Sequence, residues 1–166
     1  MRERKPNRLA GYDYSGNGSY FITICAKDRR CVLSEIVGAD DPGGPRVSLA
    51  SHGAIVEQNL SVMREIYPNV RLDNYVIMPN HLHILLTIQH EETAGEGAPR
   101  SSPPTSTLSN YVTALKKFTN KAYGENIWQR SFHDHIIRSE DDYLSRWQYI
   151  EENPKKWVMG KDEYYA

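Results

Sequence analysis

Residues 70–88 have the sequence VRLDNYVIMPNHLHILLTI. Two runs rich in β-branched and aromatic residues, 70–78 and 82–88, are separated by Pro79, Asn80 and His81. Runs of this kind, bounded by turn-forming residues, are typical of β-strands. The second run is continuously apolar over residues 84–86, so we expect the surroundings of the two histidines to be partly covered by protein. The other elements of the fold are predicted relative to these two strands.

Further strands are expected at residues 19–26, 47–49 and 131–138, from their content of β-branched and aromatic residues. A first helix is expected from Ser51 as N-cap to just before Pro68, and a second over residues 108–122 with apolar side chains at helical spacing. A third is expected over residues 141–152, ended by Asn153 and Pro154, because the residue before proline avoids the α region. The order strand, helix, two strands, helix, strand, helix predicts an α+β fold with a ferredoxin-like antiparallel sheet and helices packed mainly on one face.

The composition indicates one globular domain over residues 1–166, with flexible insertions at residues 39–46 and 91–107, where Gly, Pro, Ser and charge concentrate. Hydrophobic residues make up 39% of the chain, but no stretch of about 18 apolar residues occurs, so we expect no membrane partner. The basic N-terminus lacks the apolar segment of a signal peptide, and the two cysteines form no CxxC motif. These features predict a reduced, cytoplasmic protein.

The net charge of −1 argues against a non-specific DNA coat. Basic residues nevertheless gather between residues 111 and 138, and they are candidate contacts to a nucleic-acid backbone. A solvated helix face accounts for the same pattern. The candidates are Lys116, Lys117, Lys121, Arg130 and Arg138.

Two histidine pairs are candidates for chemistry. His81 and His83 lie two apart at the start of the apolar strand, so both imidazoles project from one face and could chelate one divalent ion. His133 and His135 have the same spacing, and the geometry of an extended strand does not choose between the pairs. Two histidines on a solvent-facing sheet surface would also show this pattern, so the spacing alone does not establish a metal site.

The last helix carries a tyrosine away from its apolar stripe. The stripe expected to pack on the sheet contains Tyr143, Leu144, Trp147 and Ile150. Tyr149 falls roughly 150° from the middle of that stripe, and Asn153 stands one turn beyond it. A phenol beside an amide and a metal could act as a nucleophile, whereas a half-exposed ring packed under the C-terminal tail would look the same in sequence.

At these residues the chain resembles the single-tyrosine HUH transposases. Residues 74–85 (NYVIMPNHLHIL) resemble the signature of that family, and the WQR and HDHIIR motifs at 128–130 and 133–138 resemble its later blocks. The Tyr149-Ile150 and Asn153-Pro154 ending resembles the REP-associated tyrosine transposase branch in particular. The resemblance spans residue 20 to about residue 157.

The resemblance implies an HUH nuclease core that uses Mg²⁺ or Mn²⁺, with His81, His83 and Asn153 as metal ligands and Tyr149 as nucleophile. His133 and His135 then support the site or contact DNA, and Tyr143 is the rival nucleophile. The implied reaction is cleavage and rejoining of single-stranded or hairpin DNA through a 5′-phosphotyrosine. A domesticated protein that binds hairpin DNA without cutting, and a metal-dependent phosphohydrolase that uses water, are the alternatives; whether the chain is a monomer or a homodimer is left open.

Overall fold

The computed structural model describes residues 17–89, 107–162 and 164. The expected insertion at 91–107 therefore lies outside the described residues, apart from Thr107. The elements are β1 (Gly18–Cys25), a 3-10 turn (Lys27–Arg29), β2 (Ser34–Val37), β3 (Arg46–Leu49), α1 (Ser51–Ile66), β4 (Val70–Ile77), β5 (His81–Ile88), α2 (Thr107–Tyr123), β6 (His133–Ile136) and α3 (Glu140–Val158).

The main sheet has the strand order β4-β5-β1-β6, and every pair in it is antiparallel. All eight residues of β5 are buried, because β5 lies between β4 and β1 and helices cover both of its faces. The short strands β2 and β3 form a separate antiparallel hairpin, whose loop contains residues 39–45. The sequence did not predict β2.

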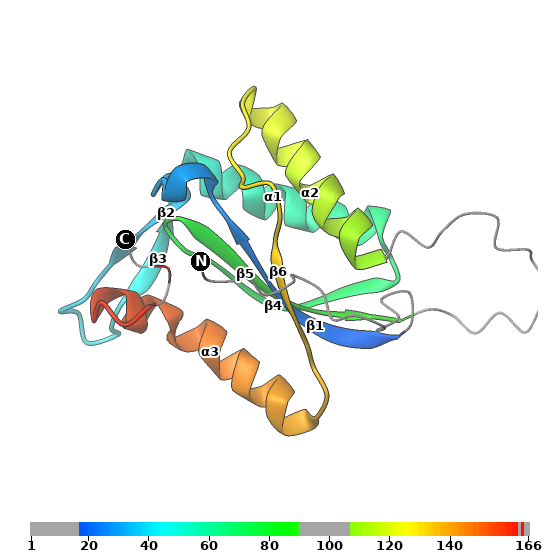
Figure 1. Cartoon of the computed structure of the whole chain (residues 1–166). Helices are drawn as coiled ribbons and strands as arrows, with labels where there is room; N and C mark the ends of the chain where they lie inside the picture. The colour runs from blue at the N-terminus through cyan, green and yellow to red at the C-terminus, as the bar shows by residue number, and fades with distance from the viewer. Residues whose placement is uncertain (1–16, 90–106, 163, 165–166) are drawn as a thin grey trace, which may run out of the picture.

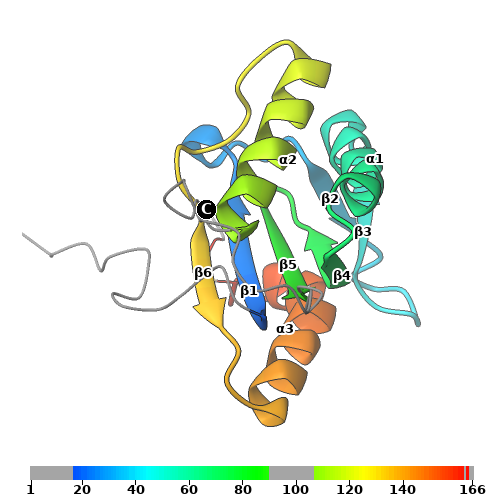
Figure 2. The same cartoon turned by 90° about the vertical axis from the view of Figure 1, so that its right-hand side faces the viewer.

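Helices α1 and α2 cover one face of the main sheet, and α3 lies against the other (Figures 1 and 2). The α+β, ferredoxin-like prediction with helices mainly on one face is confirmed. The large core lies on the side of α1 and α2, where Ile22, Leu60 and Ile84 are among its buried members. A smaller cluster that includes Phe21 and Ile150 lies beneath α3. In the described part of the chain, no helix has both the length and the apolar character needed to cross a membrane.

Two helix boundaries differ from the prediction. The N-cap of α1 is Ala50, with no side-chain hydrogen bond, and Ser51 is the first helical residue. Helix α3 does not end before Pro154 but continues through it to Val158. Proline inside a helix removes one hydrogen bond and costs about 3 kcal/mol. Here Ile150, Asn153 and Pro154 are all buried against the sheet, and this packing offsets the cost.

The face of α3 that packs on the sheet also differs from the prediction. Of the expected stripe, Tyr143 and Ile150 do pack in the cluster beneath α3. Leu144 and Trp147, which were also expected to face the core, are 56% and 38% exposed. Asn153 is fully buried, and Tyr149 packs against the small cluster beneath the helix. The side of the helix that carries the polar residues therefore faces the sheet, because that part of the sheet is itself polar.

A close backbone approach explains one glycine. A methyl group at Gly53 in α1 would lie 2.1 Å from the carbonyl oxygen of Leu33 and 3.1 Å from its carbonyl carbon. Backbone atoms cannot give way as a flexible side chain can.

We therefore predict that Gly53→Ala lowers the free energy of unfolding by about 1–3 kcal/mol, because overpacking outweighs the better helix propensity of alanine. The matched control is Gly43→Ala, whose added methyl group would meet nothing within 4 Å. Urea unfolding should show the control within about 0.5 kcal/mol of the wild type. Equal stability of the two variants would contradict the close approach.

Candidate metal and nucleophile site

The histidine pair lies at the start of β5, directly after a tight turn. The turn is closed by the backbone N–H of Met78, which donates to the carbonyl of His81 at 2.8 Å. Because alternate side chains of a strand share a face, His81 and His83 both project toward α3, with ring centroids 4.5 Å apart. Both side chains are fully buried.

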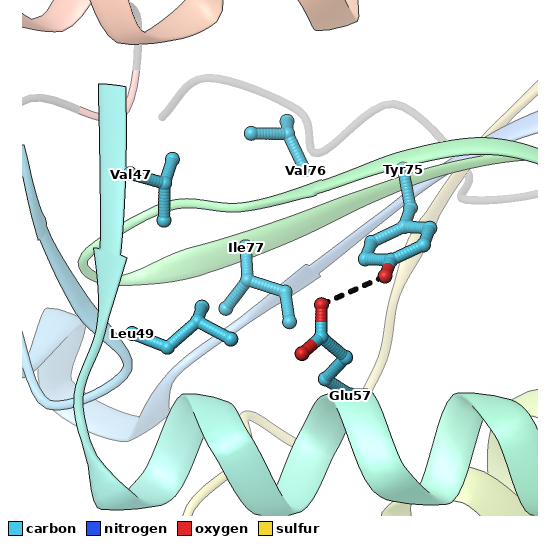
Figure 3. A pocket seen from close by; sticks show the side chains of 6 residues that line it. All are labelled: Val47, Leu49, Glu57, Tyr75, Val76 and Ile77. Atoms are coloured by element: carbon cyan, nitrogen blue, oxygen red, sulfur yellow. Dashed lines mark hydrogen bonds between the residues drawn. The ribbon is translucent and has the colours of Figure 1, made fainter. Parts of the chain in front are cut away.

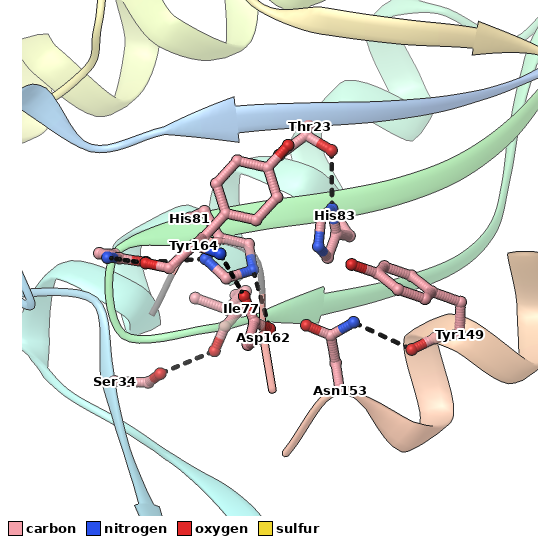
Figure 4. Close-up of polar contacts among 10 residues, drawn as sticks. Thr23, Ser34, Ile77, His81, His83, Tyr149, Asn153, Asp162 and Tyr164 are labelled. Carbon is pink, nitrogen blue, oxygen red and sulfur yellow. Dashed lines mark hydrogen bonds and ion pairs between the residues drawn. The ribbon is translucent and has the colours of Figure 1, made fainter. Parts of the chain in front are cut away.

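One nitrogen of each imidazole is held by a neighbouring side chain (Figure 4). Nδ1 of His81 lies 2.8 Å from Oδ1 of Asn80, and Nδ1 of His83 lies 2.8 Å from Oγ1 of Thr23, the residue opposite it on β1. Such contacts fix the orientation of the rings. They leave Nε2 of both histidines buried and without a hydrogen-bond partner among the described residues.

Burial keeps both imidazoles neutral. It lowers the pKa of His81 to about 4, although the neighbouring Asn153 acts in the opposite direction. It also lowers the pKa of His83 well below its ordinary value, and the nearby His81 and Arg146 lower it further. Neutral imidazole is the form that binds metal. Because Oδ1 of Asn80 can only accept, Nδ1 of His81 carries the proton and the Nε2 lone pair of His81 is available. His83 offers the same lone pair when its Nδ1 donates to Thr23.

Asn153 on α3 supplies a third oriented atom. Its Nδ2 donates to the carbonyl of Tyr149 at 3.0 Å, which turns Oδ1 toward the histidines (Figure 4). This Oδ1 is also buried without a hydrogen-bond partner among the described residues. Unpartnered buried polar atoms are costly, and two imidazole nitrogens with an amide oxygen suit a divalent cation. The residues present therefore fit a metal ion.

The amide is necessary to this arrangement. Among the described residues, no group of three or more His, Cys, Asp or Glu side chains is placed to hold a metal ion. A site at the histidine pair thus depends on Asn153, with solvent or substrate oxygens to complete the coordination shell.

The structure places Tyr149 beside the histidine pair. Its ring centroid lies 5.3 Å from that of His83, and its hydroxyl points toward His83 (Figure 4). The rings of Phe21 and Tyr149 pack at nearly right angles with their centroids 5.7 Å apart, and Nζ of Lys156 lies 4.3 Å from the Tyr149 centroid.

The rival Tyr143 has different neighbours. Burial raises its pKa, and the nearby Asp73 raises it further while Arg71 opposes the shift. Its ring packs against Trp147 at 6.2 Å. The tyrosine that α3 brings to the histidines is therefore Tyr149.

The C-terminal segment covers the pair and contributes a carboxylate that sequence reasoning missed. The ring of Tyr164 lies 4.6 Å from that of His81, and its carbonyl accepts from Nδ2 of Asn80 at 2.9 Å. Oδ2 of Asp162 lies 3.9 Å from Nε2 of His81, and the Asp162 side chain is fully buried. No sequence pattern connects residue 162 with residue 81, so only folding could reveal this proximity.

The second histidine pair does not join the first. Strand β6 pairs with the far side of β1, so His133 lies beside Thr23 and His135 beside Phe21 on the same sheet face. Nε2 of His135 contacts the carboxylate of Asp142 at 2.8 Å. Although burial opposes it, hydrogen bonds from His135 and from the Arg138 backbone hold the pKa of Asp142 below its ordinary value.

The basic candidates separate into two groups. Lys117, Lys121, Arg130 and Arg138 are exposed, on α2 and on either side of β6. Lys116 instead points its Nζ at the carbonyls of Gln129 and Ser131, at 2.8 and 2.9 Å. Burial lowers its pKa to about 8. Lys116 thus ties α2 to the segment before β6.

A pocket between β3, α1 and β4 contains none of these residues. It has a volume of about 360 Å³ and is lined by Val47, Leu49, Glu57, Tyr75, Val76 and Ile77 (Figure 3). The hydroxyl of Tyr75 donates to Glu57 at 2.9 Å at its rim.

Comparison with known proteins identifies the family. No family model matches the chain. An uncharacterised protein of Haemophilus influenzae is 31% identical over the whole chain and 95% of its own length. A putative REP-associated tyrosine transposase of the same organism is 30% identical over 87% of this chain and 74% of its own. The REP-associated tyrosine transposase of Escherichia coli K12 is 25% identical over 91% and 76%.

One solved structure shows the same fold. It is a REP-associated tyrosine transposase bound to a REP hairpin, and it superposes with a TM-score of 0.66 at 22% identity over 94% of this chain and 76% of the other. Sequence and fold together place the chain among proteins related to the tyrosine transposases. The chain belongs to the REP-associated tyrosine transposase family.

We predict that Lys116→Met lowers the free energy of unfolding by about 1–2 kcal/mol, because two carbonyls lose a charged donor. Urea unfolding measures the change. The neighbouring, exposed Lys117→Met is the control and should fall within about 0.5 kcal/mol of the wild type. If both variants were as stable as the wild type, the two hydrogen bonds of Lys116 would contribute nothing to the fold.

Proposed function

We propose that this chain is a metal-dependent single-strand DNA endonuclease and strand transferase, in which Tyr149 is the nucleophile. The observation that carries the proposal is the convergence of three buried, unpartnered atoms beside the Tyr149 hydroxyl. These atoms are Nε2 of His81, Nε2 of His83 and Oδ1 of Asn153, and they would be the protein ligands of Mg²⁺ or Mn²⁺. When bound, the cation would supply positive charge to neutralise the scissile phosphate and its leaving oxygen.

In the proposed reaction, the phenolic oxygen of Tyr149 attacks the phosphorus and the bond from phosphorus to the 3′ oxygen breaks. The phenolic proton passes to solvent or a base, and the departing 3′ oxygen takes up a proton. The products are a 5′-phosphotyrosine and a free 3′-OH. Another 3′-OH can reverse the step and rejoin DNA without an external energy source, because the phosphotyrosine retains the energy of the phosphodiester bond.

The fixed orientation of Tyr149 supports this role. The Phe21 ring packs against the Tyr149 ring, and the carbonyl of Tyr149 accepts a hydrogen bond from Asn153. The nucleophile and one proposed ligand are thus joined on a single rigid helix. A nucleophile held near its target lowers the entropic part of the barrier.

The proposed substrate is single-stranded DNA that contains a hairpin. The family relative of known structure is bound to a REP hairpin, and the same fold here supports a similar DNA. Exposed Lys117, Lys121, Arg130 and Arg138 are the proposed backbone contacts, with His133 on the same sheet face as the histidine pair. Phosphate contacts of this kind weaken as salt concentration rises.

We predict that the protein forms a covalent adduct with a labelled, hairpin-containing single strand in Mn²⁺, and that Tyr149→Phe abolishes it. Denaturing gel electrophoresis detects the adduct. The matched control is Tyr143→Phe, on the same helix but beside Asp73, which should retain the adduct. An adduct that persists in Tyr149→Phe would remove Tyr149 from the mechanism. Binding of the hairpin without any adduct would indicate a non-cleaving DNA-binding protein, and turnover without an adduct a phosphohydrolase.

We also predict that Thr23→Val weakens Mn²⁺ binding about 10–100-fold, because the hydroxyl that orients His83 is lost. Isothermal titration calorimetry on the DNA-free protein measures the affinity. Thr23→Ser keeps the hydroxyl and should bind within about threefold of the wild type. The metal assignment fails if a variant with His81→Ala and His83→Ala still binds one Mn²⁺ as tightly as the wild type.

A further inference from the structure

Arg146 lies on α3 one turn before Tyr149, so both side chains lie on the same side of the helix. Its guanidinium carbon stands 5.2 Å from the centroid of the Phe21 ring. The same ring packs against Tyr149 at 5.7 Å and against His83 at 5.0 Å. Phe21 therefore forms a shared platform for a cation, the nucleophile and one of the proposed ligands.

A carboxylate on the same helix contacts Arg146. Nε of Arg146 lies 3.7 Å from Oδ1 of Asp142, one helical turn earlier. Asp142 is in turn held by Nε2 of His135 and by the backbone N–H of Arg138. The chain of contacts from β6 to Arg146 fixes the direction in which the guanidinium points.

The hydrogen-bonding capacity of Arg146 is not used up by these contacts. Its Nε is buried and has no hydrogen-bond partner among the described residues. The side chain as a whole is 33% exposed. A planar guanidinium with open donors is suited to bidentate contact with a phosphate.

The charges of the other groups in the site favour a cation such as Arg146. The three proposed ligands are neutral, and Asp162 brings a negative charge close to His81. The guanidinium of Arg146 lies close to the histidine pair, because the ring of Phe21 contacts both Arg146 and His83. A phosphate that enters between the pair and Tyr149 would find in Arg146 a fixed positive charge outside the ligand set.

We propose that Arg146 binds a non-bridging oxygen of the scissile phosphate, and that Asp142 and His135 position it. The proposal rests on the function proposed above and deepens it. Arg146 would stabilise the negative charge on the non-bridging oxygens as the bond from Tyr149 forms, and its packing on Phe21 would hold it in place.

The test uses Arg146→Met, which retains a flexible apolar stem over Phe21 and removes the charge. With Mn²⁺ and a natural hairpin strand, we expect single-turnover adduct formation to slow about 100-fold, as for the loss of one preorganised donor to a developing charge. A strand with a neutral methylphosphonate at the scissile position should be cut by the variant and by the wild type at rates within about tenfold, because the charge that Arg146 neutralises is gone. The control, Arg64→Met, changes an exposed arginine of α1 on the opposite side of the sheet and should behave as the wild type.

A second measurement separates this proposal from the proposed function. Fluorescence anisotropy without metal should show that Arg146→Met weakens binding of the single strand about tenfold. The plot of log association constant against log salt concentration should become less steep by about 0.7, as for one lost phosphate contact. If the wild type forms no adduct, the proposed function fails, and the anisotropy result still decides whether Arg146 binds phosphate. Adduct rates and affinities equal to those of Arg64→Met would overturn the proposal.

The positioning role of Asp142 has its own readout. Asp142→Asn should slow adduct formation in the wild-type background and have no further effect in Arg146→Met, because both changes remove the same contact. Additive losses would instead mean that Asp142 acts through the fold alone and not through Arg146.

Discussion

The site depends on the position of β5 in the middle of the sheet. An interior strand covered by helices on both faces excludes water, yet β5 begins with two histidines. Each imidazole is held through Nδ1, by Asn80 or by Thr23, and this leaves both Nε2 atoms facing the same side without a partner among the described residues. Such atoms are costly in a protein interior unless they serve another purpose. The elements that pack around β5 supply polar groups to these two nitrogen atoms.

Helix α3 places polar side chains opposite the buried histidines, because its polar face is directed toward the sheet. Asp142, Arg146, Tyr149 and Asn153 recur at intervals of three or four residues, so they form one stripe along the helix. In an ordinary amphipathic helix this stripe would face water. Here it faces the histidines, while Leu144 is 56% exposed. The helix therefore serves as a rigid support for polar groups, and it contributes only a small apolar cluster to the fold.

Local patterns predicted most of the strands and helices and the shared face of the histidines, because alternation and helical spacing are properties of neighbouring residues. They failed where a distant partner decides the outcome. Pro154 lies inside a helix because burial against the sheet compensates for the lost hydrogen bond. The buried face of α3 was predicted only in part. Tyr143 and Ile150 pack beneath the helix as expected, but Leu144 and Trp147 are exposed. Apolar spacing cannot report that the sheet presents polar groups to Tyr149 and Asn153. Asp162 was not foreseen at all, because nothing in the chain near it indicates contact with His81.

The sequence by itself determined the α+β class, the family resemblance and the residue types able to hold a cation and attack a phosphate. It left two histidine pairs and two tyrosines in competition, because equal spacing gives equal local geometry. Only the tertiary structure brought Tyr149 and Asn153 to the first pair, and it placed the second pair beside β1 with His135 on Asp142. The physical reason is strand order, because β5 is interior and shielded from water, whereas β6 is an edge strand. On β6, His133 is exposed and the partly exposed His135 pairs with Asp142.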